Sequence, residues 1–163
     1  MTKSPITSPL GDAEKEATGA VLQATLVDLI DLSLIAKQAH WNVVGPNFRS
    51  AHLQLDELVA AARQYVDDVA ERANAIGVSP NGKARTVVES SGIPAYPDNW
   101  QTVEATVAAI VAILGEVIKR LRERIDATDK TDLVTQDLLI EIAAELEKQH
   151  WMWQAQTVPP LRN

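Results

Sequence analysis

Two of the three histidines in this 163-residue chain, His40 and His52, lie on either side of a Gly-Pro break. Imidazole nitrogens bind divalent transition metals, and a carboxylate, Asp56, follows His52 by about one helical turn. The chain has no cysteine, which excludes disulfides, iron–sulfur clusters, thiolate zinc sites and a cysteine nucleophile. Any metal that this chain binds must therefore be held by His, Asp and Glu.

Residues 47–76 carry apolar side chains at helical spacing, which predicts a long second helix. His52, Asp56, Asp67 and Glu71 all lie in it, and at 100° per residue they share one face, within an arc of about 100°. The step from Asp56 to Asp67 nevertheless separates the two pairs by about 16 Å along the axis, at about 1.5 Å per residue. One chain cannot close a metal site with all four side chains.

Two copies of the chain could close such a site. If their second helices pack antiparallel about a twofold axis, His52 and its neighbouring carboxylate meet Asp67 and Glu71 of the other copy. His40, at the end of an expected first helix, would complete the first half-site across the Gly-Pro bend. Two imidazoles and three carboxylates suit iron(II), manganese or zinc. The alternative is that the acidic residues are solvated surface and that His52 has no function.

The apolar spacing predicts four helices and no strands. Three features mark their ends: Gly45-Pro46, Gly77, and the polar turn ATDKT before Asp132. Asp98, with Gln101 three residues later, is typical of an N-cap for the third helix. The helices are expected over residues 13–42, 47–76, 98 to the polar turn, and 132–156, with Val158-Pro159-Pro160 as the final stop.

Connection lengths then suggest a topology. The first and last pairs of helices are joined by short turns, so each pair should be an antiparallel hairpin. Residues 77–98 form a crossover long enough to travel the length of the bundle and to hold a short helix near 83–90. One long crossover between two hairpins is the ferritin-like, all-α arrangement. We expect a single domain, with tails at 1–12 and 157–163 around a bundle at 13–156.

Composition limits the possible surroundings of the chain. We find no run of about 18 apolar residues, and the polar N-terminus lacks a signal-like stretch, so we expect a cytoplasmic protein and no membrane partner. The formal net charge of −7 disfavours a broad affinity for nucleic acid and is compatible with attracting cations.

The candidate ligands belong to a longer pattern that resembles the signature of Dps proteins, the dodecameric miniferritins. The resemblance covers essentially the whole chain, including the segment from Leu146 to Trp151. It implies a hollow shell of twelve subunits in which iron is oxidised at sites across the twofold interface. The matching residues are His40-Trp41-Asn42, Gly45, Phe48, His52, Asp56, Asp67 and Glu71-Arg72-Ala73.

The resemblance also implies roles for individual residues. The iron ligands would be His40, His52 and Asp56 of one subunit with Asp67 and Glu71 of its partner. Lys37 and Trp41 match family residues beside the site. Family members admit iron through threefold pores lined by acidic residues near the start of the fourth helix, where this chain has Asp132, Asp137 and Glu141. For Asp132 a helix cap is the alternative.

The implied activity is that of a ferroxidase. Two iron(II) ions per site would be oxidised together, preferentially by hydrogen peroxide, and the iron(III) mineral would be stored in the shell. Such a protein protects against oxidative damage because peroxide is reduced to water without release of hydroxyl radical.

Two other interpretations remain open. Glu147 and His150 form the E-x-x-H spacing that ferritin-like di-iron proteins use inside one bundle, but the second E-x-x-H is missing. The alternative function is a nucleoid-associated DNA-binding protein with weak iron activity. Its basic tails are absent, because the first eleven residues contain only Lys3 and the segment after Trp153 only Arg162. We therefore expect no strong DNA binding.

Overall fold

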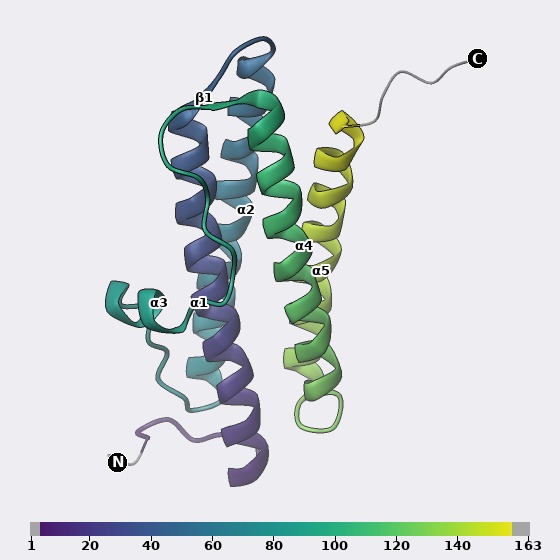
Figure 1. The fold of residues 1–163 in the computed structure, drawn as a ribbon. Coiled ribbons are helices and arrows are strands. Elements are labelled where there is room, and N and C mark those ends of the chain that lie inside the picture. Colours follow the sequence, from purple (N-terminus) through teal and green to yellow (C-terminus); the bar gives the residue numbers. More distant parts are fainter. Residues whose placement is uncertain (1–3, 158–163) are drawn as a thin grey trace, which may run out of the picture.

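The computed structural model describes residues 4–157, and four long helices dominate it (Figure 1). The predicted stop at 158–160 lies outside the described residues. In chain order the elements are α1 (Asp12–Asn42), β1 (Val43–Val44), α2 (Phe48–Ala75), α3 (Ala84–Ser90), β2 (Gln101–Thr102), α4 (Val103–Thr128), α5 (Leu133–Gln154) and the 3-10 helix η1 (Ala155–Thr157).

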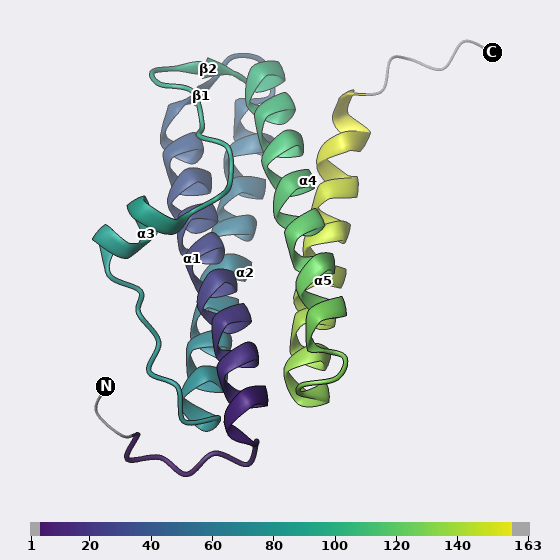
Figure 2. The same ribbon diagram turned by 60° about the horizontal axis from the view of Figure 1, so that its bottom comes forward.

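The bundle consists of two helical hairpins. α1 packs along α2, and α4 packs along α5, while the segment between α2 and α4 runs back up the outside of α1 (Figures 1 and 2). The predicted four-helix topology with one long crossover is confirmed, and α3 is the short helix expected within that crossover. The core between the hairpins is aliphatic and includes Leu22, Leu29, Leu58, Ile110, Leu114 and Leu139, all fully buried.

Among the helices of the described residues, α1 alone combines great length with a strongly apolar stretch. By length and composition alone it could cross a membrane, but 61% of the relevant 18-residue window is buried inside the bundle. A core helix of a bundle needs apolar residues around most of its circumference. Packing against the other helices therefore accounts for the hydropathy of α1.

The end of α2 shows how one glycine sets the chain reversal. Gly77 has φ 78°, and its N–H bonds the Asn74 carbonyl at 2.9 Å, while the Val78 N–H bonds the Ala73 carbonyl at 2.9 Å. This pair of bonds is the Schellman motif, which requires a left-handed residue that glycine adopts without strain. A Cβ at Gly77 would also lie 3.0 Å from the Ile6 carbonyl oxygen, so the N-terminal segment packs directly on this turn.

Two predictions about the third long helix were wrong. It begins at Val103 rather than near Asp98, and its N-cap is Thr102, whose hydroxyl accepts the Ala105 N–H at 3.2 Å. Gln101 and Thr102 are instead extended, as β2, and pair in parallel with Val43 and Val44 of β1. The prediction that the chain has no strands was therefore also wrong, since a two-residue strand is too short to show a period of two.

A buried carboxylate anchors the crossover side of the bundle. Asp28 of α1 is 1% exposed and accepts hydrogen bonds from Arg120 at 2.8 Å and from Arg124 at 2.7 Å, both on α4. One turn later, the Asp31 carboxylate accepts the hydroxyl hydrogen of Ser91 in the crossover. These contacts tie α1, α4 and the crossover together at mid-height.

Candidate functional site

His40 and His52 lie face to face across the first helical hairpin. His40 is in the last turn of α1, and His52 is near the start of α2, so the turn between the helices brings the two rings together. Their centroids are 3.6 Å apart and their planes diverge by 22°. His40 is buried, with 7% of its surface exposed, and His52 is half-buried.

Each ring is held by the backbone of the other residue. His40 Nδ1 lies 2.8 Å from the His52 carbonyl oxygen, and His52 Nδ1 lies 2.9 Å from the His40 carbonyl oxygen. A carbonyl oxygen only accepts, so Nδ1 must be the donor in both bonds. In a neutral imidazole the proton then sits on Nδ1 and the lone pair on Nε2 is available to a metal. Both histidines are thus set in the tautomer that a ligand requires.

Asp56 extends this pair by one turn along α2. Its Oδ1 accepts a hydrogen bond from Lys37 Nζ at 2.6 Å and lies 3.3 Å from His40 Nδ1. The hydrogen bond from Lys37 is the largest cause that lowers the pKa of Asp56 below its ordinary value, and the positive charge of the lysine adds to it. Asp56 is therefore an anion at neutral pH. His40, His52 and Asp56 thus lie together at this end of the α1–α2 hairpin, and we refer to these three residues as the half-site.

Asp67 and Glu71 do not join this half-site within one chain. Both are exposed on α2, and they lie several helical turns beyond Asp56. In the part of the chain that the structure describes, no group of three or more His, Asp or Glu side chains is close enough to hold a metal ion.

Two aromatic residues flank the histidines. Phe48 packs edge-on against His52 at 6.0 Å between centroids, a contact from the preceding turn of α2 that the sequence analysis did not assign to the site. The available signals were its i, i+4 spacing from His52 and its place in the Dps-like signature. Trp41 is 67% exposed and borders an apolar groove between α1 and the crossover, which Leu34, Val88 and Tyr96 also line.

The three predicted pore residues have different surroundings. Asp132 caps α5, since its carboxylate accepts the N–H groups of Val134 and Thr135, and it also forms an ion pair with Arg72 of α2. Asp132 is only 9% exposed, and both of its carboxylate oxygens accept hydrogen bonds within the chain. Asp137 and Glu141 are exposed on the first half of α5. The ion pair between Arg72 and Asp132 was not predicted from the sequence, because the two residues lie sixty positions apart.

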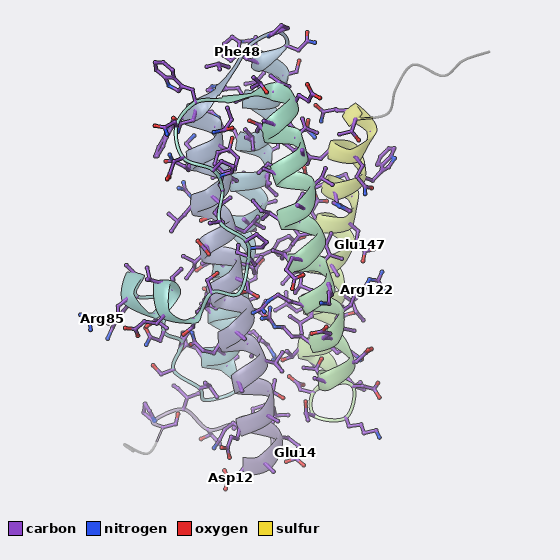
Figure 3. The ribbon with its side chains drawn as sticks, viewed as in Figure 1. Asp12, Glu14, Phe48, Arg85, Arg122 and Glu147 are labelled. Atoms are coloured by element: carbon purple, nitrogen blue, oxygen red, sulfur yellow. The ribbon has the colours of Figure 1, made fainter. Side chains whose placement is uncertain are left out.

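Of the Glu147 and His150 pair, Glu147 is bound to another residue. Glu147 accepts hydrogen bonds from the guanidinium of Arg122, with contacts of 2.6 and 2.7 Å, and Figure 3 shows these two side chains side by side between α4 and α5. Figure 3 also places Phe48 at the opposite end of the bundle from Asp12 and Glu14, so the histidine hairpin and the start of α1 are far apart. No second E-x-x-H faces Glu147 in the described chain.

Comparison with known proteins agrees with this architecture. Residues 19–158 match the family model of the ferritin-like domain. A DNA protection during starvation protein of Mycolicibacterium smegmatis is 39% identical over 146 residues, which span 90% of this chain and 80% of that protein. A relative of Agrobacterium fabrum with the same name is 31% identical over 86% of this chain and 88% of its own length.

Solved structures show the same relationship. Dps of Mycobacterium smegmatis in a tetragonal form superposes with a TM-score of 0.92 at 38% identity, covering 98% of this chain and 96% of that one. Dps of Microbacterium arborescens in a high iron form gives a TM-score of 0.86 at 31% identity, covering 92% and 97%. The fold, the sequence match and the structural match lead to one conclusion: this chain belongs to the Dps family of ferritin-like proteins.

Proposed function

We propose that this protein is a ferroxidase that oxidises iron(II) and stores the iron(III) product inside an oligomeric shell. The observation that carries the proposal is the half-site of His40, His52 and Asp56, in which both imidazoles are fixed with Nε2 free and a carboxylate stands beside them. The names of relatives support the protective role, since several are DNA protection during starvation proteins, and one solved relative is a high iron form.

The stacked rings favour two iron ions at each site. A metal bound to imidazole lies close to the ring plane, about 2.1 Å from the nitrogen. The ring centroids are 3.6 Å apart and the ring planes diverge by only 22°, so the two planes do not meet within that distance of either nitrogen. One ion cannot satisfy both rings in this arrangement, so His40 and His52 serve one ion each.

The remaining ligands come from a twofold partner. Asp67 and Glu71 of the partner subunit would face the half-site when two α2 helices pack antiparallel. This arrangement explains why two exposed carboxylates lie on the helix face that carries His52. Three carboxylates in total supply negative charge, which stabilises iron(III) relative to iron(II). Six such twofold dimers would build the dodecamer.

The reaction is a paired one-electron oxidation of two substrate ions. Each iron(II) gives up one electron, hydrogen peroxide accepts both as its O–O bond breaks, and two protons complete two molecules of water. Because both electrons are delivered together, no hydroxyl radical is released. The chain's own residues orient the ions through two fixed imidazoles and keep Asp56 ionised. Asp137 and Glu141, exposed one turn apart on α5, would line the route by which iron enters.

The test is anaerobic loading with iron(II) followed by addition of peroxide, recorded by absorbance of the iron(III)-oxo band. His52→Ala combined with Asp56→Ala should abolish the fast phase, whereas wild type consumes about two irons per peroxide. Glu147→Ala combined with His150→Ala is the matched control, since it also removes one histidine and one carboxylate from a helix, and it should oxidise iron normally. Equal rates in wild type and the first double variant would contradict the proposed site.

A further inference from the structure

Lys37 forms an ion pair with Asp56, one of the proposed iron ligands. Its ammonium lies 2.6 Å from Asp56 Oδ1, and the same oxygen lies 3.3 Å from His40 Nδ1. Lys37 is one turn before His40 on α1, and Asp56 is one turn after His52 on α2. The two pairs therefore form successive rungs across the same antiparallel hairpin.

The ammonium is a cation in contact with a proposed iron ligand. An ion that binds Asp56 through Oδ1 must compete with it, because a lone pair cannot serve an ammonium hydrogen and a metal at once. The other carboxylate oxygen, Oδ2, takes part in none of the hydrogen bonds within the described chain. A first ion can therefore bind while Lys37 stays in place, but full use of Asp56 requires the lysine to move.

Charge separates the two binding steps further. One ferrous ion and the ammonium together neutralise the three carboxylates of the proposed site, so the first ion enters an electrostatically balanced environment. A second ferrous ion adds two positive charges beside the ammonium, and like charges at close range repel. Within this chain the side chain of Lys37 is 25% exposed and that of Asp56 is 45% exposed, so the chain's own packing does not enclose the flexible lysine stem.

We propose that Lys37 acts as a tethered cation that competes with the second iron for Asp56 and so sets the iron concentration at which the paired, reactive state forms. This inference rests on the proposed ferroxidase site and adds its regulation. Lys37 is a positioning residue in this scheme, because it acts through Asp56 and does not itself bind iron. It leaves the site by side-chain rotation, without any change in covalent structure.

The experiment is a calorimetric and visible-absorption titration with cobalt(II), which resembles iron(II) in charge but needs no oxidant. Wild type should bind two ions per site in two separated steps. Lys37→Gln should tighten the second step by about tenfold or more relative to the first, since one like charge is removed. Lys37→Arg keeps the charge and should keep the two steps apart.

Lys15→Gln is the matched control, because Lys15 also pairs with an aspartate, Asp12, at 2.9 Å, but at the other end of the bundle. It should titrate like wild type. If the second cobalt(II) ion bound with the same affinity to Lys37→Gln and to wild type, the proposed competition by Lys37 would be refuted, but the proposed ferroxidase site would not. If wild type and His52→Ala gave the same titration, the metal site itself would be refuted, and this inference with it.

Discussion

Arg72 of α2 and Asp132 at the start of α5 form a buried ion pair that joins the two helical hairpins at one end of the bundle. The side chains are 18% and 7% exposed, and Thr135 hydrogen-bonds to both of them. Asp132 is thus a structural link between hairpins as well as a helix cap.

Replacement of Asp132 should lower the stability of the fold. Asp132→Asn keeps a capping side chain but leaves the Arg72 charge unpaired, and we expect a loss of about 2 to 3 kcal/mol. Asp132→Ala also removes the cap and should lose about 1 kcal/mol more. Denaturant unfolding at fixed protein concentration measures both. Asp137→Asn, an exposed change on the same helix, should be neutral; equal losses at positions 132 and 137 would contradict this role.

The same pair predicts a response to acid. Burial alone would raise the pKa of Asp132, but hydrogen bonds from Thr135 and Arg72 together outweigh it and hold the pKa below its ordinary value. A carboxyl whose pKa is lowered on folding contributes stability above the unfolded value, near pH 4, and loses it as the pH falls through the folded value. Melting temperatures between pH 7 and pH 2.5 should therefore drop below about pH 4, and drop less in Asp132→Asn. Parallel curves would refute this.

Replacement of Asp28 should lower the stability of the fold more than replacement of Asp132, because Asp28 is fully buried and pairs with two arginines. Asp28→Asn removes the negative charge that Arg120 and Arg124 both contact, and we expect destabilisation of about 3 to 5 kcal/mol. Gly92→Ala tests the same region, since a Cβ there would lie 2.3 Å from the Arg120 guanidinium. It should loosen the crossover, seen as faster amide exchange over residues 91–100. Unchanged exchange would show that Arg120 moves aside freely.

DNA binding provides a prediction about function. The first eleven residues contain only Lys3 as a basic residue, the chain carries a formal charge of −7, and residues 4–8 pack on the Gly77 turn. We expect no stable retardation of supercoiled DNA in a gel at about 50 mM salt, where electrostatic binding is strong. A variant with lysines at Thr7 and Ser8 should show whether a basic tail restores retardation. Stable complexes with the natural chain would favour the nucleoid-binding alternative.

The sequence predicted the helices well where a strong local signal ends them. Gly77 and Asp132 each mark a boundary through their own backbone or side-chain chemistry, and the predicted ends fall within one or two residues of the structure. The start of α4 was misplaced because Asp98 and Thr102 are both good caps. What decides between them is the pairing of β2 with β1, a contact between distant residues that no local pattern encodes.

The candidate site divides in the same way. Helical spacing and the Gly-Pro bend were enough to predict that His40, His52 and Asp56 lie together. The position of Lys37 on Asp56 and the reciprocal carbonyl bonds of the two histidines depend on side-chain rotamers, which spacing does not determine. The pairing of Arg72 was missed for a further reason. Its partner, Asp132, belongs to the other hairpin, so only the folded bundle shows that the two side chains form an ion pair.

The short parallel pair of β1 and β2 has a consequence for how the chain folds. Each hairpin brings together residues that are close in sequence, so it closes small loops and can form rapidly. The β1–β2 contact joins Val43 to Gln101 and closes a long loop whose entropy cost is recovered only when the helices on either side are already in place. The topology therefore favours folding in which the α1–α2 hairpin, with its histidines, is assembled before the crossover fastens it to α4.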